Sequence, residues 1–339
     1  MILNHDEAGL ELSTQLLARE ARRRDVRVEV LDADDNFLRL SRDGRVEYVK
    51  QATRTSVDPY IAALIMENKE VTKRVLREHG LPVPAGFAVR SFEEAERLWP
   101  RLAGHGVVIK PRSTNFGEGV TIFKDDAWGR QAPAAVARAL ALDSTVLLEE
   151  FVPGPEYRFL VIGEETVAVL HRVPANVIGD GTRSIRALVE EKNRDPRRGH
   201  GYVTPLEKIR LGPDEEEFLR AQGRHFDTIP AAGQTIFLRE NSNISTGGDS
   251  IDFTDAAHPG YKDAARRAAQ AVGARICGAD LIIPDIRRPP GPGSFCIIEL
   301  NFNPALHIHD FPYLGQNRHV EAKVLDLLGF SELERPARS

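Results

Sequence analysis

Two short apolar runs near the C-terminal end of the sequence finish on side chains that carry oxygen ligands. Glu299 and Asn301 follow the run from Phe295 to Ile298, and Pro304 closes the segment. Residues two apart on a strand point to the same face. A carboxylate beside a carboxamide oxygen is a hard-oxygen site of the kind that Mg²⁺ prefers.

A further acid, Asp280, lies in the other apolar run, Gly278 to Ile283, and a loop rich in Pro and Gly joins the two runs. The simplest geometry is an antiparallel strand pair that brings Asp280 alongside Glu299 and Asn301. The alternative is a plain hairpin with polar ends, which is the commoner meaning of an isolated Glu-x-Asn. A helix over residues 261–277 is expected to lead into the Asp280 strand.

A glycine-rich turn follows the predicted buried strand Val107 to Pro111 and contains Gly117 and Gly119. The exposed backbone N–H groups of such a turn can hold phosphate oxygens. Lys110, near the end of the strand, would add a positive charge beside them. The segment is not a P-loop, because no Gly-Lys-Ser/Thr opens a helix there, and an ordinary hairpin is an equal alternative.

A helix is predicted over residues 67–79, with Asn68 near its start and Gly80 as its C-terminal stop. Lys69 and Lys73 are four residues apart and therefore share one face of this helix. A solvated face is the default interpretation of two such lysines, and phosphate binding is the alternative.

A strand, a tight turn and a second strand are predicted over residues 146–162, which places Glu149, Glu156 and Arg158 close together. Acids within a strand are costly to bury unless they accept hydrogen bonds. An adenine amino group and ribose hydroxyls would provide these bonds, so the segment is a candidate nucleotide site.

Further polar segments have weaker signals. Four basic residues gather in residues 192–198, as a solvated face or as a contact for an acidic substrate: Lys192, Arg194, Arg197 and Arg198. The loop 238–249 is polar and glycine-ended, and long polar loops in compact domains are often functional. His307 and His309 form a His-x-His pair, but no third ligand has suitable spacing, so a zinc role is the weaker interpretation.

Composition restricts the class of protein. The 339 residues suffice for about two domains, and the formal charge of −5 argues against a general nucleic-acid binder. We expect no bilayer-spanning run and no signal peptide, because the N-terminus carries acids where a basic start is needed. Cys277 and Cys296 lie in apolar segments, so we expect them to be reduced and buried in a cytoplasmic protein.

The order of these motifs along the chain resembles the ATP-grasp ligases. Longer stretches, including "LIMENKEVTKRVLREHGLPVP", "NVIGDGTRSIRALVEEKNRDPRRG", "RENSNISTGGDSIDFTD" and "IELNFNPALHIHDFPYLGQNR", are similar to the C-terminal half of the bifunctional glutathione-synthesising enzymes. The insertion also resembles cyanophycin synthetase. The resemblance covers almost the whole chain, and its motifs are specific.

The resemblance implies a role for each motif. Lys69 and Lys110 would contact ATP phosphates under the Gly117–Gly119 turn, and Glu156 would bind the ribose. The adenine slot would be lined by Glu149, Glu150, Phe151 and Val152. Asp280, Glu299 and Asn301 would hold two Mg²⁺ ions, with Mn²⁺ as a possible substitute. Arg158 and Arg239 are the candidates for stabilising the transferring phosphate.

The implied fold class is α/β and α+β, namely an ATP-grasp fold with two α+β lobes and a short N-terminal α/β domain. The expected boundaries are 1–65 for the N-terminal domain, 66–150 for the first lobe and 151–339 for the second, with an insertion at 175–250. ATP would lie between the lobes. We also expect a homodimer, with no nucleic-acid or membrane partner.

The implied reaction is ATP-dependent amide formation from a carboxylate and an amine through an acyl phosphate. Such chemistry needs positioning and charge neutralisation rather than a protein nucleophile. The first expectation for the small-molecule substrates is γ-glutamylcysteine and glycine, with Arg239 and the basic residues 192–198 pairing with substrate carboxylates. Another amino-acid or peptide pair and a catalytically silent nucleotide-binding module remain alternatives.

Overall fold

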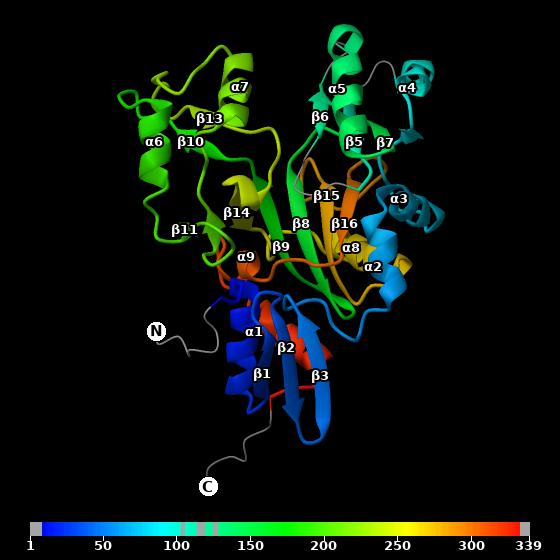
Figure 1. The fold of residues 1–339 in the computed structure, drawn as a ribbon, viewed down its shortest axis with the longest axis vertical. Coiled ribbons are helices and arrows are strands. Elements are labelled where there is room, and N and C mark those ends of the chain that lie inside the picture. Colours follow the sequence, from blue (N-terminus) through cyan, green and yellow to red (C-terminus); the bar gives the residue numbers. More distant parts are fainter. Residues whose placement is uncertain (1–8, 103–105, 114–118, 125–127, 333–339) are drawn as a thin grey trace.

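The structure is a computed structural model that describes residues 9–102, 106–113, 119–124 and 128–332. The described residues form one three-stranded, one four-stranded and one five-stranded sheet, with two small two-stranded sheets. The three-stranded sheet lies at one end of the molecule, and the other layers lie above it in Figure 1. No helix within these ranges is long and apolar enough to cross a membrane.

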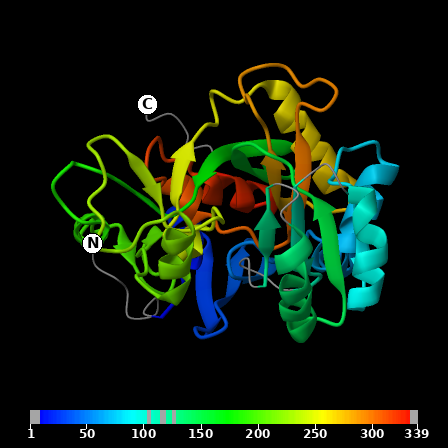
Figure 2. The same ribbon diagram turned by 90° about the horizontal axis from the view of Figure 1, so that it is seen from above.

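The N-terminal layer packs against the C-terminal end of the chain. It contains α1 (Leu12–Arg23) and the antiparallel strands β1 (Arg27–Asp32), β2 (Phe37–Arg42) and β3 (Arg45–Lys50), in that spatial order. Leu17 and Leu38 share a buried cluster with Val324 of α10 (Val320–Leu327). Figures 1 and 2 show α10, in red, beside this blue layer. The first and last described segments therefore form one core.

Two helices connect this layer to the next, α2 (Tyr60–Glu67) and α3 (Lys69–Glu78). The Asn68 side chain accepts a hydrogen bond from the Val71 N–H, which caps the start of α3. Gly80 follows with a positive φ of 70°, the left-handed conformation that commonly ends helices. The predicted helix at 67–79 is confirmed, with its start shifted to Lys69.

The four-stranded sheet has the order β4-β7-β5-β6 and is antiparallel. Its strands are β4 (Gly86–Val89), β5 (Val107–Pro111), β6 (Thr121–Phe123) and β7 (Val146–Glu150). The helices α4 (Phe92–Leu98) and α5 (Trp128–Leu142), with the 3₁₀ turn η2 (Trp99–Leu102), complete this unit. The Ser91 side chain caps the start of α4 by accepting a hydrogen bond from the Glu94 N–H.

The five-stranded sheet carries the predicted acidic strands. Its antiparallel order is β14-β9-β8-β15-β16, from β8 (Glu156–Ile162), β9 (Glu165–Val173), β14 (Asp249–Asp252), β15 (Ile276–Ile282) and β16 (Cys296–Asn301). Asp280 of β15 lies opposite Glu299 of β16, so the predicted strand pair is confirmed. Both cysteines are buried and free, as expected.

The helix before β15 is shorter than predicted. We expected a helix over residues 261–277, but α8 covers Pro259–Ala271. Gly273 adopts a positive φ of 76°, which a continuing helix cannot accommodate, and Cys277 already belongs to β15. The residues after Ala274 are apolar and enter a short buried strand. Composition alone does not distinguish such a strand from the end of a buried helix.

Residues 176–246 add a small unit with its own buried cluster, which includes Val177, Ile185 and Leu219. Its elements are β10 (Asn176–Ile178), α6 (Ile185–Lys192), β11 (Arg198–Gly199), β12 (Leu206–Glu207), α7 (Pro213–Ala221), β13 (Thr235–Phe237) and the turn η3 (Ile244–Thr246). This unit and the four-stranded sheet lie on opposite sides of the views in Figures 1 and 2. The short helix α9 (His307–Asp310) follows β16.

Candidate active site

A cavity of about 640 Å³ brings most of the predicted site residues together. It is lined from the four-stranded sheet, the β7–β8 connection, the polar loop after β13 and the strands β15 and β16. The predicted residues on its wall are Lys69, Lys110, Glu149, Glu150, Phe151, Val152, Glu156, Arg239, Asp280 and Glu299. Its volume is in the range of ordinary small-ligand sites.

The two predicted glycines of the phosphate turn have different outcomes. Gly117 lies outside the described residues. Gly119 has a φ of +72°, and a Cβ built on it would approach Pro111 Cγ at 2.8 Å and Leu142 Cδ1 at 2.6 Å. The position therefore requires glycine for backbone conformation and close packing, whatever it contributes to a ligand.

Two lysines bind the buried carboxylate of Glu149. Lys73 of α3 donates to Oε1, and Lys110 of β5 lies 2.9 Å from Oε2. Burial alone would raise the pKa of Glu149, but Lys110 and Lys73 hold it below its usual value. Burial, with Lys110 nearby, lowers the pKa of Lys73 to about 8. Lys73 is therefore buried, although a solvated lysine was the default expectation. Glu149 was expected to accept hydrogen bonds from adenine, but in this structure two lysines bind it.

Glu156 is bound by two side chains, Arg172 and Ser242, whose pairing with it was not predicted from the sequence. Arg172 of β9 lies opposite it in register, 2.9 Å from Oε1, and the Ser242 hydroxyl donates to Oε2 at 2.6 Å. Burial raises the pKa of Glu156, although Arg172 opposes this effect. Ser242 belongs to the polar loop that was expected to be functional.

Asp280 is the centre of a buried charge cluster. Arg158 donates to both of its carboxylate oxygens, with Nη2 2.8 Å from Oδ2, and Arg172 Nη1 lies 3.1 Å from Oδ2. The Asn301 amide lies 3.2 Å from the same oxygen. Burial raises the pKa of Asp280, but Arg158 and Arg172 outweigh it and hold the pKa below its ordinary value. Arg172 was missed, although a lone arginine in the apolar strand 165–173 was a usable signal.

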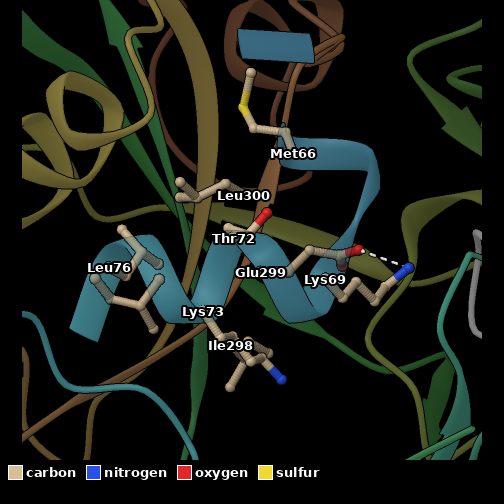
Figure 3. A pocket seen from close by; sticks show the side chains of 9 residues that line it. Met66, Lys69, Thr72, Lys73, Leu76, Ile298, Glu299 and Leu300 are labelled. Atoms are coloured by element: carbon tan, nitrogen blue, oxygen red, sulfur yellow. Dashed lines mark ion pairs between the residues drawn. The ribbon is translucent and has the colours of Figure 1, made fainter. Parts of the chain in front are cut away.

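The same region has a donor set that fits a divalent cation. Asp280 and Glu299 are opposed across β15 and β16, Asn301 Nδ2 lies 3.2 Å from Asp280 Oδ2, and all three side chains carry oxygen donors. Lys69 Nζ lies 3.4 Å from Glu299 Oε1. A dashed line marks this ion pair in Figure 3. Within the described residues no group of three or more His, Cys, Asp or Glu side chains is placed to hold a metal. The fit therefore rests on two carboxylates and one carboxamide.

The other basic and histidine candidates have internal partners. Arg239 Nε lies 2.5 Å from Glu215 Oε1, although its side chain still lines the cavity. Lys192 and Arg198 both bind buried Asp249, and neither lines this cavity. Residues 192–198 were expected to meet substrate carboxylates, but these two cations instead fix the inserted unit to β14.

His307 is also buried, with Nδ1 2.9 Å from the Ser13 hydroxyl, and burial lowers its pKa to about 4. Burial lowers the pKa of His309 to about 3. Both rings are therefore neutral near pH 7, and no third ligand of the usual zinc-binding types is placed beside them in the described ranges.

A second cavity of about 300 Å³ adjoins the first. Four side chains line both cavities: Lys69, Arg172, Asn243 and Glu299. The rest of the second cavity's wall comes from four parts of the chain. These are Arg54 after the N-terminal layer, the end of α2, the inserted unit at residues 202–207 and 244–245, and β16 with the residues that follow it to 308. Arg158 of β8 and Asn301 of β16 also line it. The two cavities thus meet beside the candidate metal ligands.

Comparisons with known proteins agree with this arrangement. A family described as an ATP-grasp-like domain matches residues 8–61. A crystal structure of a bifunctional glutathione synthetase from Pasteurella multocida superimposes with a TM-score of 0.74 at 47% identity, covering 95% of this chain and 44% of that one. The chain has the ATP-grasp fold. The predicted ATP-grasp fold, built here from helices and three larger antiparallel sheets, is confirmed.

Curated relatives of this ATP-grasp chain match over nearly its full length. It is 55% identical over 319 residues to the glutathione biosynthesis bifunctional protein GshAB of Clostridium perfringens, covering 94% of this chain and 41% of the relative. It is 52% identical over 330 residues to the protein of that name from Desulfotalea psychrophila, covering 97% and 42%. The chain therefore spans about two fifths of the length of these relatives.

Proposed function

We propose that this chain is an ATP-dependent carboxylate–amine ligase that joins γ-glutamylcysteine to glycine. The observation that carries the proposal is the meeting of two cavities, of about 640 and 300 Å³, at Lys69, Arg172, Asn243 and Glu299. One cavity has the size and lining for a nucleotide, and the other has the size for a small peptide. Identities of 49% to 55% to bifunctional glutathione biosynthesis proteins support the choice of substrates.

The reaction follows from the position of this junction. The terminal carboxylate of the peptide attacks the γ-phosphorus of ATP, ADP leaves, and an acyl phosphate forms. The amine then attacks the acyl carbon, and phosphate leaves. Lys69 lies at the junction, where its charge would stabilise the oxygens of the transferring group, and Lys110 lies on the wall of the larger cavity.

ATP and Mg²⁺ are the general requirements of the family, and bound Mg²⁺ would neutralise charge on the phosphates. Asp280, Glu299 and Asn301 are the residues that would hold it. Two ions, and Mn²⁺ as a substitute, are part of the proposal. Arg158 and Arg172 lower the pKa of Asp280 and so keep its carboxylate ionised.

The remaining site residues have proposed roles in binding and orientation. Phe151 and Val152, in the β7–β8 connection, would flank the adenine, with Glu149 and Glu150 beside them. Glu156 would accept a ribose hydroxyl, and Gly117 and Gly119 would cover the phosphates. Arg158 and Arg239 would stabilise the acyl phosphate, which requires each guanidinium to share its present carboxylate partner.

Several broader expectations belong to the same proposal. The chain would divide into an N-terminal domain at 1–65 and lobes at 66–150 and 151–339, with the insertion at 175–250. It would act as a homodimer in the cytoplasm on small molecules, without a nucleic-acid or membrane partner.

The test is an ADP-release assay of the purified chain with a panel of amino acids and short peptides, with mass detection of products. We expect ADP and a product of the mass of glutathione only when γ-glutamylcysteine, glycine and Mg²⁺ are all present. Preferential turnover of another pair of acid and amine substrates would show that the chain is a different peptide ligase. No ADP with any pair, despite nucleotide binding, would identify a silent binding module.

A further inference from the structure

The charged side chains around the 300 Å³ cavity are mostly paired. Lys69 faces Glu299, Arg158 and Arg172 bind Asp280, and Glu207 accepts the Tyr202 N–H at 2.8 Å. All of these except Asp280 line the cavity. A ligand in the cavity therefore meets few charges that are free to respond to it.

Two charges on this wall differ from the rest. Arg54 and Glu67 both line the cavity and are both exposed, and neither makes an ion pair within the described part of the chain. Glu67 is the last residue of α2, where the carbonyl end of the helix adds negative potential. An acid at this position is unfavourable for the helix alone, and it is well placed to bind a cationic group.

Arg54 is held in place although it lacks an acidic partner. Its guanidinium carbon lies 4.7 Å from the centre of the Phe302 ring, directly after the strand that carries Glu299 and Asn301. Stacking of this kind fixes the plane of the guanidinium and leaves its N–H groups free for an anion.

The backbone that leads to Arg54 is also fixed. Lys50 and Arg54 exchange two backbone hydrogen bonds of 2.9 and 3.0 Å. Between them Gln51 and Ala52 have left-handed φ values of 51° and 64°, which are costly for residues other than glycine. The turn is fastened to Asn303, which donates to Gln51 at 3.0 Å and accepts from Thr53 at 2.8 Å. Arg54 is thereby tied to the segment that follows the candidate metal strand.

We propose that Arg54 and Glu67 together recognise a free α-amino acid group on the peptide substrate. Arg54 would bind its carboxylate, and Glu67 would bind its ammonium group. This inference rests on the proposed function and adds to it the two residues that would select the γ-glutamyl end of the acid substrate.

The proposal explains how the site distinguishes a γ-linked from an α-linked glutamyl peptide. A γ-linked glutamyl residue presents its amino and carboxylate groups on one carbon, so that a cation and an anion on the wall of one cavity can bind both. An α-linked residue separates these groups along its side chain. The opposite end of the peptide would carry the reacting carboxylate to the junction beside Glu299.

The test uses substrate analogues that each lack one charge. Glutarylcysteine lacks the ammonium group, and 4-aminobutyrylcysteine lacks the distal carboxylate. We expect Arg54→Gln to raise KM for γ-glutamylcysteine about tenfold, as for one lost charge-assisted hydrogen bond. It should change KM for 4-aminobutyrylcysteine by less than about twofold, because the partner of Arg54 is absent there.

Glu67→Gln should show the complementary pattern, with about a tenfold rise in KM for γ-glutamylcysteine and little change for glutarylcysteine. KM for ATP and kcat should stay within about twofold in both variants, which a general structural defect would not allow. Two matched controls are Arg101→Gln, an arginine stacked 5.1 Å from Phe87, and Glu70→Gln, an exposed acid on α3. Neither lines the cavity.

The outcomes separate the two proposals. Failure of the unaltered chain to join γ-glutamylcysteine and glycine would overturn the proposed function. It would also overturn the proposed recognition of the α-amino acid group by Arg54 and Glu67. An active chain whose Arg54 and Glu67 variants behave like the controls would overturn only this inference. Equal losses with the full substrate and with the matching analogue would also overturn it, because the effect would not depend on the charge being recognised.

Discussion

Asp280 and Glu299 lie directly opposite each other on the antiparallel strands β15 and β16, so that two carboxylates occupy neighbouring positions on one face. Like charges in such a pair are destabilising by themselves. Arg158, opposite Asp280 on β8, and Lys69, 3.4 Å from Glu299, offset this repulsion. A paired acid site that is maintained by surrounding cations is suited to a divalent ion.

The first prediction concerns this acid pair. Glu299→Gln and Asn301→Ala should each lower kcat by about a hundredfold or more, because charge on the transferring phosphate would no longer be balanced. The free energy of unfolding should change by less than about 1 kcal/mol, because both side chains are partly exposed. Glu217→Gln, an exposed acid on α7, is the control. Near-normal turnover at saturating Mg²⁺ would remove the altered residue from the metal shell.

The second prediction concerns Lys73, whose charge is buried against Glu149. Lys73→Met should lower the free energy of unfolding by about 3 kcal/mol, because removing one partner leaves part of a buried charge uncompensated. Adding Glu149→Gln should enlarge this loss, because buried Lys110 would then lose its carboxylate partner as well. Arg74→Met is the control on the exposed face of the same helix, where an i,i+4 ion pair contributes about 0.5 kcal/mol or less.

Denaturant unfolding of the four proteins measures these differences. A loss in Lys73→Met no larger than in Arg74→Met would show that Lys110 alone satisfies Glu149.

The third prediction concerns Gly119. Gly119→Ala should lower the free energy of unfolding by about 1–3 kcal/mol, because the residue has a left-handed φ and its Cβ would crowd the Pro111 ring. Gly291→Ala is the matched control, since a Cβ there meets nothing within 4 Å and its φ is not left-handed. Equal thermal and denaturant stability of the two variants would contradict the packing described for Gly119.

The fourth prediction concerns pH. Burial and the neighbouring carboxyl group of Glu321 raise the pKa of Asp310 to about 8. A carboxyl group with a raised folded-state pKa stabilises the fold fully below its unfolded pKa, and this contribution is lost as the pH rises through the folded value. The chain should therefore lose stability between pH 6.5 and 8, by at most about 1.4 kcal/mol per pH unit.

Asp310→Asn should remove this loss, and Glu321→Gln should reduce it. Asp34→Asn, at an exposed position, should leave it unchanged. His307 and His309 have lowered pKa values, so their contribution is present above about pH 6.5 and is lost only as the pH falls. Denaturant unfolding at pH 6.5 and 8 makes the comparison. The same decline in Asp310→Asn as in the unaltered chain would assign the effect to other groups.

Local signals in the sequence predicted the parts of the fold that depend on neighbouring residues. The cap at Asn68, the end of α3 at Gly80 and the pairing of the Asp280 and Glu299 strands follow from residue type and spacing. The predicted end of α8 was wrong because the helix stops before Gly273, which has a positive φ, while the apolar pattern continues beyond it.

Contacts between residues far apart in the sequence were harder to predict. Lys73 and Arg172 reach Glu149 and Asp280 from elements 76 and 108 residues away, so sequence spacing could not pair them. Packing of α10 against α1, around Leu17 and Val324, joins the two ends of the chain for the same reason. Candidate site residues, including Lys110 and Arg158, could therefore be named from the sequence, but the pairing of Lys73 with Glu149 and of Arg172 with Asp280 could not.

The most direct test of the central claim follows the oxygen atoms of the substrate. The chain would be supplied with ATP, Mg²⁺, glycine and γ-glutamylcysteine whose cysteine carboxylate carries ¹⁸O at both positions. Carboxylate activation predicts that each released phosphate contains one ¹⁸O atom, while the new amide keeps the other. Phosphate without ¹⁸O, alongside ADP formation, would contradict the acyl phosphate and with it the proposal that this chain is a carboxylate–amine ligase.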